Sequence, residues 1–430
     1  MKRLLLALVV IVVAMAAAVV LLNRRGEDPV VARAQEGEAP LDPGLAERGR
    51  YLALAGNCAG CHTTPGGEPY AGGTGILTPF GTVFASNLTP HRETGIGEWS
   101  ASEFWRAMHN GRSRDGRLLY PVFPYPNYTR ITRDDSDAIL AWLRTLPPVE
   151  RSNTPHALRF PYDTQAALAV WRALFFSPGI QEADPSRSAQ WNRGAYLVNG
   201  LGHCNACHSG RNLFGASASG TLDLSGGLIP VQNWYAPSLS APEQAGVADW
   251  EIGDIVALLG TGISPRGSTI GPMADVVRDS TRHLAPPDLE AMAAFLKALP
   301  PASATSRPAP DSRALEGTME AGRRVYREHC ADCHGDEGQG VPGAYPALSR
   351  NRAVTMDPPA NLVHIVAMGG FAPATQGNPR PFGMPPFATT LSDGEIAAVL
   401  TMIRNSWSNG AAPVTTVEVR RYRGGDAGGR

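Results

Sequence analysis

The chain has 430 residues, of which 43% are apolar and 18% charged, with 47 glycines and 37 prolines. This length suffices for about three domains and excludes one small module. The composition is globular and loop-rich, which excludes disorder throughout the chain. The 38 basic residues nearly balance the 39 acidic ones, so no excess positive charge is available for a phosphate backbone, and nucleic acid is not an expected partner.

The N-terminal segment, residues 1–30, predicts a membrane anchor. Residues 4–22 contain only Ala, Val, Ile, Leu and Met, and a helix of that length spans roughly 28 Å, close to the hydrocarbon thickness of a bilayer. A cleaved signal peptide is the alternative, but its apolar core is usually about 7–15 residues long. The nearest small-x-small site, residues 32–34, lies well past Leu22. We expect one uncleaved transmembrane helix and leave the signal peptide open.

The six cysteines form three Cys-x-x-Cys pairs, and a histidine follows each pair directly. They are Cys58, Cys61 and His62 (CAGCH), Cys204, Cys207 and His208 (CNACH), and Cys330, Cys333 and His334 (CADCH). This pattern is typical of c-type haem attachment, in which both sulfurs form thioethers with the porphyrin and the histidine binds the iron. The pairs are too far apart for one zinc ribbon, and a thioredoxin-like motif gives no reason for the histidine. The sequence predicts three covalently bound haem c groups.

The haem motifs also predict the compartment. Haem c is attached on the outer side of the bacterial inner membrane, so we expect a single pass through the inner (cytoplasmic) membrane with the haem domains in the periplasm. The charges beside the apolar segment do not decide its orientation, because Lys2 and Arg3 on one side face Arg24 and Arg25 on the other. The orientation therefore rests on the haem chemistry.

One helical module recurs around the three motifs. Each motif follows a helical start with a small and an aromatic residue on one face, and each is followed by a terminal helix suited to pack on that face. The starts are residues 48–52, 193–197 and 321–326, and the terminal helices are residues 134–146, 287–299 and 392–404. Residues 99–111 also run parallel to residues 250–262 without a gap. Two copies of one fold explain that match better than chance.

The predicted fold class is mainly α, with three tandem cytochrome c-like helical domains after one N-terminal transmembrane helix. Pro-rich connections over residues 149–184 and 301–313 separate the domains, and the Gly/Arg-rich C-terminal end is too polar to bury much surface. The expected parts are the anchor at 1–30, cytochrome c domain 1 at 40–150, domain 2 at 185–300, domain 3 at 314–408 and a flexible tail at 409–430.

The three histidines are expected to be proximal iron ligands. Such a histidine needs an acceptor for its other ring nitrogen, commonly a backbone carbonyl. Matching places in the three repeats offer the carbonyls of Ser86, Pro237 and Pro346. A proline at such a place fixes the turn and leaves its carbonyl oxygen available.

Methionines are expected on the opposite, distal side of two irons, where a thioether raises the haem potential and suits electron transfer. Met273 follows His208 in a Gly/Pro loop, and Met384 follows His334 in another. Both are predicted distal ligands. Met108 and Met368 lie within apolar helices and are expected to fill the core instead.

The first repeat lacks such a methionine. Aligned on the second repeat, the place of Met273 falls in the segment YPVFPYP, where Phe123 stands. Met108 aligns with a leucine and is expected to pack, and His109 aligns with a glycine and is expected at the surface. Ligation by either one after a local shift and an open five-coordinate iron remain alternatives, so the sixth ligand of the first haem is unknown.

These motifs resemble the three-haem cytochrome c subunits of bacterial membrane-bound dehydrogenases, over about residues 43–408. The resemblance is carried by residues 78–100, 111–121, 191–208 and 271–277. Members serve alcohol, gluconate and sorbitol dehydrogenases or molybdenum hydroxylases of the nicotinate, isoquinoline and aldehyde type. In the alcohol and gluconate branch the first-repeat loop usually reads Tyr-Pro-x-Met-Pro-Tyr. Phe123 and the stretch at 171–179 are more similar to the molybdenum-hydroxylase branch.

The expected function is electron transfer from a dehydrogenase catalytic subunit to quinone or the respiratory chain. The resemblance implies that this partner is a molybdenum hydroxylase with an iron–sulfur subunit. No catalytic residue is assigned, since the chain needs no substrate chemistry of its own. Two alternatives remain: a multihaem enzyme with a reactive open haem in domain 1, and a free-standing carrier that delivers electrons to a terminal oxidase.

Overall fold

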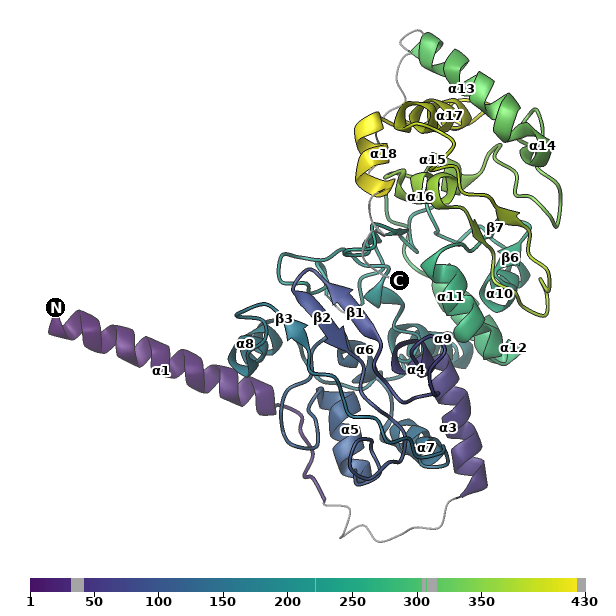
Figure 1. Cartoon of the computed structure of the whole chain (residues 1–430). Coiled ribbons are helices and arrows are strands. Elements are labelled where there is room, and N and C mark those ends of the chain that lie inside the picture. Colours follow the sequence, from purple (N-terminus) through teal and green to yellow (C-terminus); the bar gives the residue numbers. More distant parts are fainter. Residues whose placement is uncertain (32–41, 221, 304–306, 308–314, 424–430) are drawn as a thin grey trace. The chain divides into compact units, whose positions relative to one another are not determined.

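The computed structural model describes residues 1–31, 42–220, 222–303, 307 and 315–423, and its regular structure is mainly α-helical (Figure 1). The chain forms two compact units rather than three separate bodies. Unit 1 comprises residues 1–188, 195–206 and 212–222, and unit 2 comprises residues 189–194, 207–211 and 223–430. The second haem motif is therefore divided, with Cys204 in unit 1 and Cys207 in unit 2.

Unit 1 contains the long N-terminal helix, the first haem motif and a small sheet. Its helices are α1 (Lys2–Arg24), α3 (Pro43–Ala55), α4 (Cys58–His62), α5 (Ala101–Asn110), α6 (Tyr125–Tyr128), α7 (Arg133–Leu143) and α8 (Gln165–Phe175). Its strands are β1 (Gly75–Thr78), β2 (Gly81–Phe84) and β3 (Ala157–Leu158), which form an antiparallel sheet in that order. The stretch at 149–184, expected as a connection, thus contains a strand and a helix.

Unit 2 contains most of the second repeat and all of the described third repeat. In chain order the helices are α10 (Ile252–Thr261), α11 (Pro272–Asp279), η2 (Thr281–His283), α12 (Pro286–Lys297), α13 (Glu316–His329), α14 (Ala331–His334), α15 (Arg352–Thr355), α16 (Ala360–Met368), α17 (Asp393–Arg404) and α18 (Thr416–Arg423). Helix α9 (Ala189–Asn199) is divided between the units, and η1 (Cys204–Ala206) belongs to unit 1.

Short two-residue strands complete unit 2. They pair as antiparallel hairpins: β4 (Gly227–Leu228) with β5 (Tyr235–Ala236), β6 (Ile263–Ser264) with β7 (Gly267–Ser268), and β8 (Gly370–Phe371) with β9 (Gly383–Met384). Such ladders are too short to form a core by themselves. Strand β5 leads directly to Pro237, and β9 contains Met384.

A glycine at the same place in each repeat lets the first and last helices approach closely, as the sequence predicts. A Cβ atom on Gly49, Gly194 or Gly322 would overlap the backbone of the partner helix. The backbone it would meet is that of Ala138, Ala291 and Ala398, and the next contact is with the residue four positions later, Trp142, Phe295 or Met402. One packing geometry therefore occurs three times.

The helix ends follow the local sequence signals. Ser392 and Glu395 form a capping box at the start of α17, and Ser100 and Glu103 form a second one at α5. These bonds satisfy backbone N–H groups that the first helical turn leaves unpaired. Helices α5 and α10 both end at a glycine with positive φ, so the segments that match in sequence also match in structure.

Over its described residues, 409–423, the C-terminal end differs from the flexible tail predicted for 409–430, and residues 424–430 lie outside the described part. Residues 416–423 form α18, which packs on α16 and α17 and buries Val419 and Tyr422 completely or nearly so. Arg420 and Arg423 also pair with Asp393 at the start of α17. Val419 and Tyr422 lie three positions apart on one face of α18, and their burial anchors this two-turn helix.

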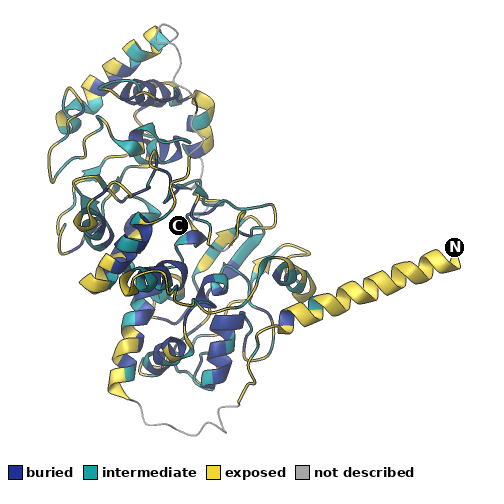
Figure 2. Cartoon of the chain, turned by 180° about the vertical axis from the view of Figure 1, so that it is seen from behind, coloured by how far each residue is buried: buried dark blue, intermediate teal, exposed yellow. Residues whose placement is uncertain are grey.

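The last turn of α1 and the residues after it are joined to the body of unit 1. The side chain of Asn23 is buried and donates to the carbonyl of Ala169 at 2.9 Å. Farther along, Trp105 donates to Asp28 at 2.8 Å and Arg112 pairs with Glu27 at 2.6 Å. The remainder of α1 is exposed along its length (Figure 2).

Candidate functional site

Each motif histidine donates a hydrogen bond from Nδ1 to a backbone carbonyl. The acceptor of His62 is Ser86 at 2.7 Å, that of His208 is Pro237 at 2.7 Å, and that of His334 is Pro346 at 3.0 Å. These are the three carbonyls that the sequence predicts. A carbonyl oxygen only accepts, so the Nδ1 atom carries the proton and Nε2 keeps its lone pair for a metal. The histidines therefore fit the proximal position of a haem c.

Burial keeps these imidazoles in the neutral form that an iron ligand needs, because it disfavours the charged form. It lowers the pKa of His62, His208 and His334, while the hydrogen bond to the carbonyl acts weakly in the opposite direction. The rings are therefore neutral at physiological pH, which is the form that binds iron. The hydrogen bond holds both the tautomer and the orientation of each ring.

The cysteines of the first and third motifs lie on or directly beside short helices. Cys58 and Cys61 lie in α4, and Cys330 directly precedes α14, which contains Cys333. Burial raises the pKa of Cys58 to about 12 and that of Cys330 to about 11. Thiols of this kind stay protonated at neutral pH, unlike the low-pKa nucleophile of a dithiol redox motif. The environment thus favours the haem interpretation over thiol–disulfide exchange.

Helix α6 joins the first and second motifs within unit 1. The hydroxyl of Tyr128 donates to the carbonyl of Gly56 at 2.9 Å, two residues before Cys58. The ring of His203, next to Cys204, lies edge-on to Tyr128 with ring centroids 5.8 Å apart. Sequence reasoning missed this contact, because neither residue belongs to a metal-binding spacing.

A buried asparagine reinforces the same contact. The Asn127 amide donates to the carbonyl of Asn199 at 2.9 Å and to Oδ1 of Asn205 at 2.7 Å. Asn205 is the residue after Cys204, inside the second motif itself. The cysteine ends of the first two motifs are therefore held close together within unit 1.

The predicted distal methionines occupy different local structures. Met384 lies in β9 and pairs with Gly370 in β8, and its carbonyl leaves no space for a Cβ on Gly369. Met273 lies in the first turn of α11 rather than in a loop, directly after Gly271 and Pro272. Both methionines are half-buried, and their role as iron ligands stays a prediction.

The first repeat has aromatic side chains where a methionine would stand. The ring of Phe123 is half-buried and lies 5.4 Å from the ring of Tyr128. Met108 is buried as predicted, but Met368 at the end of α16 is 40% exposed and does not fill the core.

His109 is buried, contrary to the expected surface position. Its ring stacks on Trp105 with centroids 4.3 Å apart, and Nδ1 lies 3.3 Å from the hydroxyl of Thr129. The alignment with a glycine misled the prediction, because the segment at 123–129 covers this side of α5 in unit 1 only.

The second and third repeats meet at the loop that holds His208. The amide of Asn361, in the first turn of α16, donates to the carbonyl of Tyr235 at 2.8 Å and accepts from its N–H at 2.9 Å. Gln244 accepts from the N–H of Ser238 at 2.7 Å. The carbonyl of Pro237 lies between these two fixed points, so side chains of both repeats orient it.

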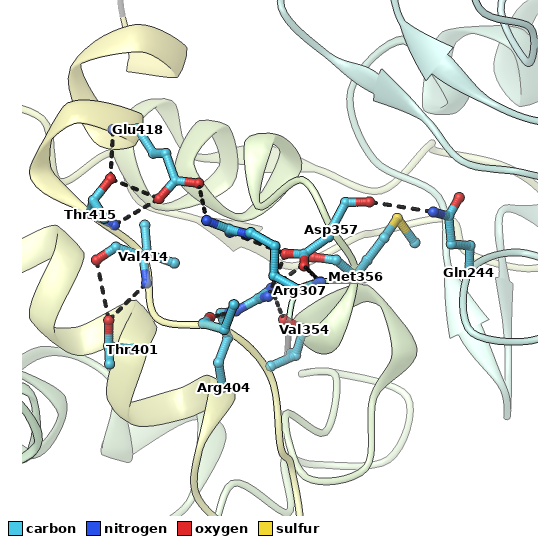
Figure 3. A network of polar contacts seen from close by, with 11 residues as sticks. Gln244, Arg307, Val354, Met356, Asp357, Thr401, Arg404, Val414, Thr415 and Glu418 are labelled. Carbon is cyan, nitrogen blue, oxygen red and sulfur yellow. Dashed lines mark hydrogen bonds and ion pairs between the residues drawn. The ribbon is translucent and has the colours of Figure 1, made fainter. Parts of the chain in front are cut away.

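A network of charged side chains, with Arg404 buried and Arg307 exposed, extends from the same place (Figure 3). Gln244 donates to the carbonyl of Asp357, whose carboxylate pairs with Arg404 at 2.8 Å and with Arg307 at 3.2 Å. Arg307 also pairs with Glu418 of α18 at 2.9 Å. Arg404 is fully buried and donates to three backbone carbonyls, those of Val354, Met356 and Ala412. The network ties α17 and α18 to the loop before α16.

Two family models match the chain. Cytochrome c matches residues 46–147, and subunit III of cbb3-type cytochrome c oxidase matches residues 317–402. These ranges enclose the first and third motifs. The haem chemistry inferred from the geometry of the histidines therefore agrees with that of the matched families.

Curated relatives match over most of the chain. The alcohol dehydrogenase (quinone) cytochrome c subunit of Gluconobacter oxydans is 37% identical, over 91% of this chain and 84% of the relative. The gluconate 2-dehydrogenase cytochrome c subunit of Pantoea cypripedii is 36% identical, over 88% of this chain and 89% of the relative. A nicotinate dehydrogenase subunit of Pseudomonas putida is 42% identical over 85% of this chain, which spans only 30% of that protein.

Proposed function

Because this chain belongs to the family of dehydrogenase cytochrome c subunits, we propose that it binds three haem c groups and passes electrons from a dehydrogenase catalytic subunit to quinone or the respiratory chain. The observation that carries this proposal is a geometry repeated at His62, His208 and His334. Each histidine directly follows a Cys-x-x-Cys pair and donates its Nδ1–H to a backbone carbonyl. Three copies of one ligand geometry favour three equivalent cofactors.

The residues divide the work in a simple way. The haem groups supply one-electron redox chemistry, and the protein supplies position, axial ligands and burial. The cysteine pairs hold the porphyrins, the three histidines are the proximal ligands, and the distal ligands are Met273 and Met384. The contact of Tyr128 with Gly56 holds the first two motifs together.

We propose that α1 is an uncleaved anchor in the inner membrane, with the haem domains in the periplasm. The most apolar 18-residue window of α1 has a mean hydropathy of 3.3, and none of that window is buried in the protein. The contacts of Asn23, Glu27 and Asp28 with the body of unit 1 support retention of this segment. Cleavage after residue 31 would leave the buried Arg172, which donates to Asn23 at 2.9 Å, without that acceptor.

The partner is proposed from the relatives. Their names support a dehydrogenase catalytic subunit, and the match to the nicotinate dehydrogenase subunit supports the molybdenum-hydroxylase type with its iron–sulfur subunit. Phe123, in the place of a methionine, points to the same branch. Quinone or a terminal oxidase would accept the electrons.

The haem content tests the core of the proposal. The full chain is expressed with working cytochrome maturation, and intact mass after denaturation gives the number of attached haems. We expect three, and two after replacement of both cysteines of one motif by alanine. Fewer than three haems in the unaltered chain would contradict the proposal.

Addition of carbon monoxide to the reduced protein tests the reactive-haem alternative. An electron-transfer subunit with closed irons shows no spectral change, whereas an open iron in the first repeat binds the gas. Copurification with a dehydrogenase in detergent tests the free-standing alternative, because a tight catalytic partner is incompatible with it.

A further inference from the structure

Helix α8 presents an apolar face to solvent. Val170 is 48% exposed and Leu174, four residues later, is 67% exposed, with Ala166 one turn before them on the same side. The one charged residue of this helix, Arg172, is buried and points into unit 1. A surface helix of a water-soluble protein normally buries its apolar face and exposes its charged residues, and α8 shows the opposite arrangement.

A neighbouring loop extends this face. Leu213 is 91% exposed and Phe214 is 58% exposed. The loop is fixed to α8, since the indole of Trp171 donates to the carbonyl of Phe214 at 2.9 Å and the rings of Phe175 and Phe214 lie 5.9 Å apart. We call Val170, Leu174, Leu213 and Phe214 the juxtamembrane patch.

The patch is built onto the end of the anchor. Asn23, the first residue after the apolar run of α1, donates to the carbonyl of Ala169 and accepts from Arg172, both at 2.9 Å. Figure 1 shows α8 beside the C-terminal end of α1. Because the apolar run ends at Leu22, this junction falls where hydrocarbon gives way to lipid headgroups. Arg24 and Arg25 are exposed at the same level.

We propose that the juxtamembrane patch rests in the interfacial layer of the phospholipid bilayer, beside the membrane helix. This inference rests on the proposal that α1 is a retained anchor. Its apolar side chains then continue the apolar surface of α1, and Trp171 and Phe214 lie where aromatic residues favour the interface. Contact at a second point fixes the orientation of unit 1, and with it the first haem motif, relative to the membrane.

Lipid is the occupant that the position favours. Exposed apolar patches of this kind usually mark a protein or membrane contact. A partner protein needs a surface it can approach, whereas this patch adjoins the point where the chain leaves the bilayer, which the lipid headgroups occupy. The patch residues carry no charge that a partner would pair.

Photolabelling of the full chain tests the proposal. The haem-loaded protein is reconstituted into phosphatidylcholine vesicles that contain a phospholipid with a photoactivatable carbene precursor near its glycerol, and adducts are mapped on tryptic peptides. We expect adducts on peptides 4–24, 160–172 and 173–187, and background labelling on peptide 134–144 of α7 in the same unit. Val170→Glu with Leu174→Glu should reduce adducts on the two α8 peptides several-fold and leave peptide 4–24 unchanged.

A control is Val417→Glu, which adds one negative charge, against two in the α8 variant, at a 74% exposed valine of α18 and should leave the α8 adducts unchanged. Adducts on peptide 4–24 with only background on the α8 peptides would overturn the inference and leave the anchor intact. Absence of adducts on peptide 4–24 would refute the anchor, and the inference with it. Protection of the α8 peptides only in a purified complex, without lipid adducts, would assign the patch to a partner protein instead.

Discussion

At the residue scale, each candidate haem site depends on one histidine and on the backbone carbonyl that orients it. The proximal carbonyls of Ser86, Pro237 and Pro346 could be predicted because a histidine ligand needs an acceptor and the three repeats supply one at matching places. The burial of His109 could not be predicted, since it depends on the ring of Trp105 and on Thr129, which lies 20 residues farther along the chain.

Met384→Leu tests the distal ligand of the third haem. Loss of a thioether ligand should lower the midpoint potential of one haem and abolish one methionine-to-iron charge-transfer band in the oxidised spectrum. Redox titration and near-infrared absorption measure these changes. Met368→Leu, at a 40% exposed methionine of the same repeat, should change neither. Equal effects of both substitutions would remove Met384 from the ligand set.

Tyr128→Phe tests the contact between the first two motifs. It removes the hydroxyl that donates to the Gly56 carbonyl, which keeps a hydrogen bond with His203, so the loss is that of one hydrogen bond, about 0.5–1.5 kcal/mol. We expect a lower unfolding midpoint for unit 1 in urea and faster hydrogen exchange at residues 199–205. Tyr162→Phe alters an exposed tyrosine of the same unit and should leave both unchanged. No difference between the two variants would contradict the role of Tyr128.

At the scale of elements, the paired helices of each repeat follow from local sequence. A small residue on the first helix and an apolar stripe on the last one predict close packing, and the structure confirms it at Gly49, Gly194 and Gly322. Helix α18 escaped prediction because its stability comes from burial of Val419 and Tyr422 against α16 and α17. Composition alone does not report such long-range packing.

Two substitutions in α13 should have opposite effects. Gly322→Ala would push a Cβ into Ala398 and to 2.6 Å from Cβ of Met402, and overpacking of this kind costs about 1–3 kcal/mol. Gly317→Ala, in the first turn of the same helix, meets nothing within 4 Å and should stabilise it by about 0.5–1 kcal/mol. Thermal unfolding of the two variants measures the difference. A neutral Gly322→Ala would contradict the close packing.

At the scale of the whole molecule, the contacts between repeats could not be predicted from the sequence. Asn361, Gln244 and Arg404 look like ordinary surface or helix residues until the fold brings the loop at 235–238 to α16. The repeats themselves were predictable because each carries its own signals, but their grouping into two compact units is a property of the surfaces between them.

The Asp357 network predicts a pH dependence for unit 2. Burial acts to raise the pKa of Asp357, but hydrogen bonds from Arg307 and the charge of Arg404 outweigh it, so the pKa is lowered. The ionised carboxylate therefore stabilises the folded state at neutral pH. This stability is lost as the pH falls below about 4, from the pKa of Asp357 in the unfolded chain toward its lower pKa in the folded chain. Thermal unfolding between pH 3 and 7 measures this loss.

Asp357→Asn should remove most of that pH dependence. At pH 7 it leaves the buried guanidinium of Arg404 without its counter-charge, which costs about 3–5 kcal/mol. Glu290→Gln, on the exposed side of α12, is the matched control and should keep the unaltered pH profile. Unchanged stability of the Asp357→Asn variant at pH 7 would show that the ion pair contributes nothing.

Helix α16 has only nine residues, yet its two ends contact the loops of two different candidate haem sites. Asn361 near its start holds the loop behind His208, and Gly369 just after its end fits under the carbonyl of Met384. Any sliding of this helix would disturb the iron surroundings of the second and third repeats in one movement. We therefore expect a substitution that displaces α16 to shift the midpoint potentials of both proposed haems.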